Sequence, residues 1–206
     1  MPPRQYESEV SMLEAAATEL EEMRSDNSNH GLHPLPPTCY KILTNLPGNH
    51  QCMDCGSNHP EWATVSYGAL LCLQCSGKHR SLGVKTSCVR SISMDNWSHS
   101  QVLSMLEGGN TQLSQFFERH ALVPQNIHET DHRYKTKAAR FYREHLKLHV
   151  QKVSCGGMYQ GREASRSTKQ EQRRTTPSPR QQQQQPRRPR RTSTPRTTNV
   201  QQKVSA

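Results

Sequence analysis

The chain has 206 residues, and only 31% of them are apolar, so one domain of ordinary size with unpacked extensions is expected. The formal net charge is +10, but residues 152–206 hold 13 Lys or Arg against 2 acids, while residues 1–151 hold 14 against 15. The basic excess therefore belongs to the tail, and a cationic folded surface of the kind that binds nucleic acid is not expected.

Residues 1–35 are predicted to be an acidic helical extension followed by a linker. Within residues 7–24 the apolar side chains recur at the spacing of a helix: Val10, Leu13, Ala17 and Leu20. Because this stripe covers only about two heptads, the helix either docks on the domain, pairs with a partner, or stays a solvated extension. Residues 25–37 are rich in turn-forming residues and are predicted to be the linker.

Residues 36–150 are predicted to form one compact module of the α+β class. Helices are predicted at 38–45, 73–82, 98–107, 111–120 and 136–149, and strands at 62–67, 69–71 and 89–92. Residues 151–206 contain Ser/Thr-Pro pairs, a glutamine run and few bulky apolar side chains. Such a composition cannot offset its own ordering entropy, so a disordered basic Gln/Pro/Arg-rich tail is expected there.

Four of the seven cysteines have the spacing of metal ligands: Cys52-x2-Cys55-x16-Cys72-x2-Cys75. Each Cys-x2-Cys knuckle brings two sulfurs to one side of a tight turn, and two knuckles complete a tetrahedron for Zn²⁺. A closed four-sulfur site leaves no position for water, so one structural zinc ion is predicted. The sequence shows neither a signal peptide nor an apolar stretch of membrane-spanning length, so reduced thiols and a cytoplasmic location are expected.

Two neighbouring residues in the predicted helix at 73–82 should point in different directions. A step of about 100° per residue places His79 about 40° from Cys75 and Arg80 about 140° from it. His79 should therefore face the metal side, and Arg80 should face outward. A lone surface arginine is most often a solvated charge, but a guanidinium held rigidly outward can enter a phosphate site on another protein.

Further motifs follow one another in order: WATVSYG at 62–68, CSGKHRSLGV at 75–84, VRSISMDNW at 89–97, Gly109-Asn110 and YKTKAARFYREHL at 134–146. With the cysteine spacing, they closely resemble the domain of GTPase-activating proteins for Arf-type small GTPases. The resemblance covers residues 36–150. It implies a zinc-finger module with a three-stranded antiparallel sheet flanked by helices.

The resemblance also implies a function and a site. Arg80, in the Cys-Ser-Gly-x-His-Arg segment, would enter the GTP site of an Arf-family GTPase in trans, where such arginines accelerate hydrolysis by about 10³ to 10⁵. The chain has no G-x4-G-K-[ST] loop, so it is expected to activate the GTPase without a nucleotide site of its own. The residues implied to contact the GTPase are Trp62, Leu73, Met94 and Asp95. For Trp62, Leu73 and Met94 the alternative is core packing. At Lys85 the chain departs from many members, which have histidine.

Two other functions are alternatives to GTPase activation. A GATA-type zinc finger that binds nucleic acid also pairs two knuckles and continues into a basic tail, but here the module is near neutral and SGKHRSLG follows Cys75 instead of a basic helix. A scaffold that kept the fold without activity is the second alternative, and Arg80 argues against it. The tail is expected to contact an anionic membrane surface, with peripheral location on Golgi or other trafficking membranes as the family expectation.

Overall fold

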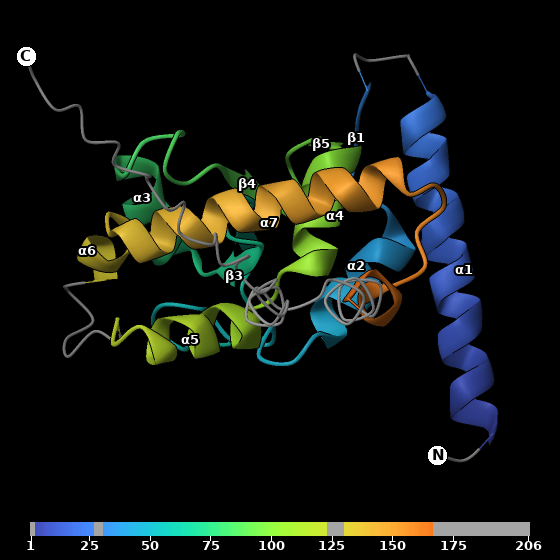
Figure 1. Ribbon diagram of the computed structural model, residues 1–206, viewed down its shortest axis with the longest axis horizontal. Coiled ribbons are helices and arrows are strands. Elements are labelled where there is room, and N and C mark those ends of the chain that lie inside the picture. Colours follow the sequence, from blue (N-terminus) through green and yellow to red (C-terminus); the bar gives the residue numbers. More distant parts are fainter. Residues whose placement is uncertain (1–2, 27–30, 123–129, 167–206) are drawn as a thin grey trace, which may run out of the picture. The chain divides into compact units, whose positions relative to one another are not determined.

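The computed structural model describes residues 3–26, 31–122 and 130–166. Its helices are α1 (Pro3–Ser25), α2 (Pro37–Asn45), α3 (Leu73–Ser81), α4 (His99–Glu107), α5 (Asn110–Arg119), α6 (Thr130–Tyr134) and α7 (Lys137–Cys155). Its strands are β1 (Leu32–His33), β2 (Trp62–Thr64), β3 (Ala69–Leu71), β4 (Val89–Ser91) and β5 (Trp97–Ser98) (Figure 1). Helices and small antiparallel sheets confirm the α+β class, whereas the tail from residue 167 onward lies outside the described residues.

The central sheet has three antiparallel strands in the order β3-β2-β4. Trp62 pairs with Leu71 on one side and with Ser91 on the other, so β2 and β3 form a hairpin whose second strand ends directly before Cys72. The turn between β2 and β3 requires glycine, because Gly68 has a φ of 62° and a Cβ there would lie 2.8 Å from the Cα of Gly108. This close approach joins the sheet to the end of α4.

Helices α4 and α7 pack against each other over the core (Figure 1). Ser98 and Gln101 form a capping box at the start of α4, and buried residues of α7 include Tyr142 and Leu146. Phe141 does not share this buried face, since it is 61% exposed. Phe141 and Tyr142 are adjacent, so the helix turns them about 100° apart and they cannot face the same neighbour.

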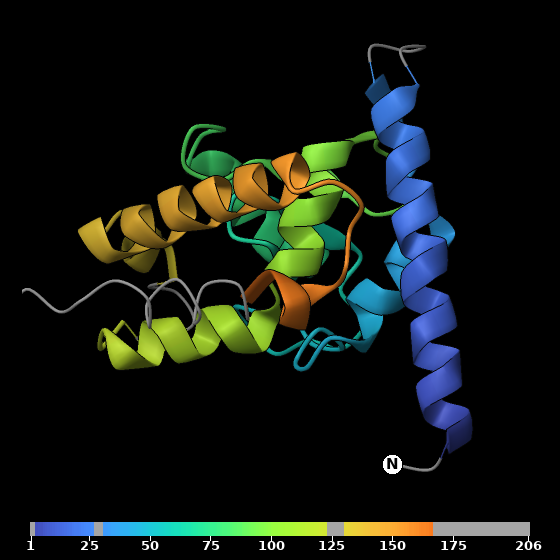
Figure 2. The ribbon, with the colours of Figure 1, turned by 45° about the vertical axis from the view of Figure 1, so that its right-hand side comes forward.

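Helix α1 docks on the domain, which is one of the three arrangements that the sequence allowed. It packs against α2 (Figure 2), and its buried side chains are Ala16, Ala17, Leu20 and Met23. The carboxylate of Glu19 accepts hydrogen bonds of 3.0 Å and 3.1 Å from the backbone N–H groups of Thr38 and Cys39. Helix α2 has no side-chain cap of its own, so α1 supplies the acceptor that its first turn needs.

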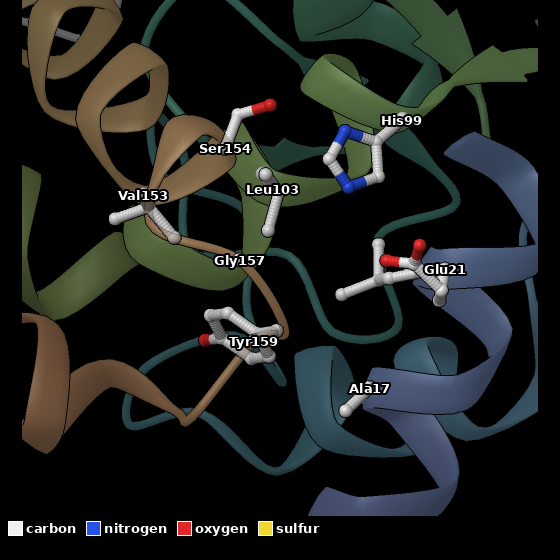
Figure 3. Close-up of a pocket in the computed structure, with 9 residues that line it drawn as sticks. Ala17, Glu21, His99, Leu103, Val153, Ser154, Gly157 and Tyr159 are labelled. Carbon is white, nitrogen blue, oxygen red and sulfur yellow. The ribbon is translucent and has the colours of Figure 1, made fainter. Parts of the chain in front are cut away.

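A crevice marks the line along which α1 meets α4 and the end of α7. Figure 3 shows Glu21 and His99 facing it from α1 and α4, with Tyr159 on its other side. Burial, together with the charge of Arg24, lowers the pKa of His99. The crevice contains neither the cysteines nor Arg80, so it belongs to the docking of α1.

The described chain stays packed beyond residue 150, where the predicted domain ends. Helix α7 continues to Cys155, and the Tyr159 side chain beyond it is buried. The side chain of Leu13 on α1 lies close to Gly161. The division into residues 1–35, 36–150 and 151–206 itself stays a prediction. No helix among the described residues is long and apolar enough to cross a membrane.

Candidate functional site

The four predicted cysteine ligands come together at one place. Their sulfur atoms lie within 4.8 Å of one another, and the sulfurs of Cys55 and Cys72 are 3.6 Å apart. Four sulfurs at about 2.3 Å from a tetrahedral zinc are about 3.8 Å from each other, so the cluster fits that metal. Cys72 also caps α3, because its sulfur accepts from the backbone N–H of Cys75. The metal cluster and the start of α3 are therefore one structural unit.

The hydrogen bond between Cys52 and Cys75 affects the two thiols in opposite ways. It lowers the pKa of Cys52 to about 5, and together with burial it raises the pKa of Cys75. Cysteines bind a metal as thiolates, so a cation at this site would displace the protons that the sulfurs carry.

His79 and Arg80 point in different directions, as the helical geometry predicts. The His79 side chain is 1% exposed, whereas Arg80 lies on the surface. The Arg80 guanidinium carbon lies 4.4 Å from the centre of the Trp62 ring, which is a cation–π contact. The half-buried Trp62 therefore supports the arginine from β2, a contact that no spacing rule in the sequence indicates.

Two of the other predicted contact residues have exposed apolar side chains. Leu73, at the start of α3, is 65% exposed, and Met94, after β4, is 73% exposed. The alternative of core packing is therefore wrong for both. Asp95 has a local role, since its carboxylate accepts a 2.7 Å hydrogen bond from the backbone N–H of Ser91 and so closes the turn that carries Met94.

A buried polar network lies on the other side of α3 from Arg80. His79 Nε2 is 3.0 Å from Asp54 Oδ2, and His79 Nδ1 is 2.7 Å from the hydroxyl of Ser87. Asp54 also accepts a 2.6 Å hydrogen bond from Tyr134 and a bond from Arg133. Burial alone would raise the pKa of Asp54, but the hydrogen bond and charge of His79, with the charge of Arg133, hold it below its ordinary value.

The network contains residues that the sequence analysis did not single out. Asp54 is an acid inside the first Cys-x2-Cys knuckle, and that position was the one available signal. Ser87, Arg133 and Tyr134 carry no spacing signal, because they come from a loop and from α6. Only the fold brings them to His79 and Asp54.

A second buried carboxylate joins the end of α4 to the segment after α7. Glu107 accepts hydrogen bonds from Tyr159 at 3.0 Å and Ser165 at 2.8 Å, and its Oε2 is 2.7 Å from His149 Nε2. Burial would raise the pKa of Glu107, but these three hydrogen bonds lower it. This network contains no cysteine of the cluster, and its role is to hold the last described segment.

Fold and site together define a small four-cysteine metal module that presents one arginine beside the metal knuckle. A model of the ArfGap family, described as "Putative GTPase activating protein for Arf", matches residues 38–151. This match covers more than half of the chain. The chain therefore belongs to the ArfGap family, which confirms the resemblance.

Curated proteins and solved structures agree with the family. The chain is 44% identical over 111 residues to "ADP-ribosylation factor GTPase-activating protein 3" of Bos taurus and 41% identical over 107 residues to "ADP-ribosylation factor GTPase-activating protein GCS1" of Saccharomyces cerevisiae. These matches cover 53% and 50% of this chain but 21% and 29% of the relatives. The chain thus spans less than a third of their length.

A solved structure carries the same fold. The "putative GTPase activating protein for ADP ribosylation factor from Cryptosporidium parvum" is 31% identical, with a TM-score of 0.50 over 54% of this chain and 88% of that one. The described helices, the small sheets and the cysteine cluster thus confirm the expected class of fold.

Proposed function

We propose that this chain activates GTP hydrolysis by an ADP-ribosylation factor and that Arg80 is the residue that enters the nucleotide site of the GTPase. The observation that carries the proposal is the setting of Arg80. Its guanidinium is exposed and stacked on Trp62, while the preceding residue in the same helix, His79, is buried and hydrogen-bonded on both ring nitrogens. The named activities of the relatives support the same conclusion.

The chemistry asked of Arg80 is electrostatic. Negative charge spreads over the phosphoryl oxygens as GTP is hydrolysed, and a guanidinium offers a planar fork of N–H donors to these oxygens. Because Arg80 belongs to a packed helix, little conformational entropy is lost when the partner binds. Nucleotide and magnesium are held by the GTPase in this proposal, so the mechanism requires no nucleotide site on this chain.

The metal is proposed to be one structural Zn²⁺ held by Cys52, Cys55, Cys72 and Cys75. When bound, it cross-links the two knuckles and supplies folding free energy. Since the second knuckle forms the first turn of α3, the ligands determine where the helix with Arg80 begins. The cysteines are thus proposed to support the arginine without taking part in the hydrolysis.

The face that meets the GTPase is proposed to consist of Trp62, Leu73, Met94 and Asp95 around Arg80. Exposed Leu73 and Met94 offer apolar area that a partner can bury. Asp95 would act mainly by holding the turn at 91–95, given its bond to the backbone.

The remaining parts of the proposal concern location. Residues 151–206 are proposed to include a basic tail that contacts anionic membranes, which is supported by its excess of 11 positive charges, 13 Lys or Arg less 2 acids. A cytoplasmic protein attached at the surface of Golgi or other trafficking membranes is the matching location. A nucleic-acid-binding finger is not favoured, because the chain belongs to the ArfGap family and its folded part carries no basic excess.

The test is the substitution Arg80→Lys in the full chain. Lysine keeps the charge but lacks the bidentate fork, so stimulation of GTP hydrolysis by a GTP-loaded ADP-ribosylation factor should fall by about 10³-fold. Zinc content and thermal stability should stay as in the wild type, because Arg80 is exposed. Undiminished stimulation by the lysine variant would refute the role of Arg80.

A further inference from the structure

His79 lies directly before Arg80 in α3, but its side chain is 1% exposed and cannot reach a partner. We infer that Asp54 and His79 are positioning residues for Arg80, which aim its guanidinium by fixing the C-terminal half of α3. The inference rests on the proposed function and deepens it, because it assigns to a buried pair the orientation of the exposed arginine.

The hydrogen bonds around His79 form a chain across three parts of the fold. Thr64 on β2 lies 2.7 Å from the Ser87 hydroxyl, Ser87 lies 2.7 Å from His79 Nδ1, and His79 Nε2 lies 3.0 Å from Asp54. Both ring nitrogens of His79 therefore have a hydrogen-bond partner, the Asp54 carboxylate at Nε2 and the Ser87 hydroxyl at Nδ1. The imidazole is thus fixed in plane and in tilt from both sides.

Asp54 connects this series of hydrogen bonds to the rest of the fold. It lies between the metal ligands Cys52 and Cys55, and its second oxygen accepts from Tyr134 and Arg133 of α6. The rings of His79 and Tyr134 are 4.4 Å apart in an edge-on contact. One carboxylate therefore ties the first metal knuckle, α3 and α6 together.

The consequence for Arg80 follows from where α3 is held. Cys72 and Cys75 fix its first turn, and His79 fixes its last turn. Without the second anchor, the helix end can rotate about the metal knuckle, and a small rotation displaces the tip of a long arginine by a larger distance. Displacement of a reacting group by about 1 Å can cost on the order of 10²-fold in rate.

The alternative is that Asp54 and His79 only stabilise the fold. Glu107 offers a matched control, because it too is a buried carboxylate bound to a histidine and a tyrosine. Within the described ranges, the hydrogen bonds of its carboxylate go to His149, Tyr159 and Ser165 and not to α3 or the four cysteines. A purely structural role predicts equal kinetics for variants of the two acids, whereas a positioning role predicts a change only for Asp54.

The experiment compares full-length wild type, Asp54→Asn and Glu107→Gln, all loaded with zinc, on a GTP-loaded ADP-ribosylation factor. For Asp54→Asn we expect kcat to fall by about 10- to 100-fold while KM changes less than about 2-fold, because the contact face is intact. Glu107→Gln should keep the wild-type kcat and KM. A third variant, Ser87→Ala, removes the partner of Nδ1 and should lower kcat by about 3- to 10-fold, and it decides the question if Asp54→Asn does not fold.

The outcomes are separable. A wild-type kcat in Asp54→Asn and Ser87→Ala, or an equal loss in Glu107→Gln, would overturn the positioning role while the proposed function stands. A loss confined to KM would also overturn it, since misplacement of Arg80 acts on turnover. No stimulation by the zinc-loaded wild type would overturn the proposed function and this inference together.

Discussion

Asp54 and Glu107 are the central carboxylates of two hydrogen-bond networks that contain the same kinds of side chains. Each carboxylate is almost fully buried, with 1% and 0% of the side chain exposed, and each is bound to a histidine and a tyrosine. Such carboxylates are tolerated in a core only when their oxygens are paired. The two networks differ in the helices and segments that they connect.

The Asp54 network lies wholly within residues 38–151, which the ArfGap model matches. Its partners come from α3, a loop and α6, and it lies next to the proposed catalytic arginine. The Glu107 network joins α4 and α7 to Tyr159 and Ser165, which follow the matched region. Similar chemistry thus serves the proposed active surface in one place and the attachment of an added segment in the other.

Removal of the metal should reduce the stability of the protein more than any other change, and it should first destabilise the region of the Asp54 network. Structural zinc sites contribute apparent binding energies of about 10–16 kcal/mol, so chelation should abolish the cooperative thermal transition of the wild type. Hydrogen exchange should rise in residues 52–81 before it rises in α4. An unchanged melting temperature in zinc-free protein would contradict the structural role of the metal.

Truncation of the two acids should separate the networks by stability. Asp54→Ala leaves the Arg133 guanidinium buried without its carboxylate, and arginine cannot lose its proton, so a loss of about 3–5 kcal/mol is expected. Glu107→Ala leaves the hydroxyl groups of Tyr159 and Ser165 without their acceptor, so a loss of about 1–3 kcal/mol is expected. Urea unfolding of both variants measures the difference, and equal losses would show that the buried guanidinium adds nothing to the cost of removing Asp54.

A single hydrogen bond of the second network can be removed without a cavity. Tyr159→Phe deletes the hydroxyl that donates to Glu107, and a loss of about 1 kcal/mol is expected by urea unfolding. Stimulation of GTP hydrolysis should stay at the wild-type level, because the proposed site lies in the other network. A change in kcat would show that the two networks are coupled.

Acidification should produce the smallest change in stability, which concerns the Glu107 network. The pKa of Glu107 is lower in the folded state, so its contribution is complete above the unfolded pKa of about 4.3 and is lost as pH falls through the folded pKa. The stability advantage of wild type over Glu107→Gln should therefore shrink between about pH 5 and pH 3. Calorimetry across this range tests it, and an advantage that grows on acidification would refute the assigned direction.

Much of the site could be predicted because the responsible rules act over short distances in the sequence. The spacing of Cys52, Cys55, Cys72 and Cys75 predicted the cluster, and helical periodicity separated His79 from Arg80. The helices predicted at 73–82 and 98–107 depend on equally local patterns. By contrast, α1 offered three possible arrangements, since a short apolar stripe does not identify the surface that buries it.

The sequence by itself determined the cluster of four cysteines, the family and the outward direction of Arg80, since each depends on residue type and spacing along the chain. Only the tertiary structure placed Arg80 over Trp62, joined Asp54 to His79, Arg133 and Tyr134, and carried the chain past residue 150 to Glu107. These contacts connect residues up to 80 positions apart. No local sequence pattern predicts these contacts, because the partners of a buried charge depend on how whole helices and strands pack together.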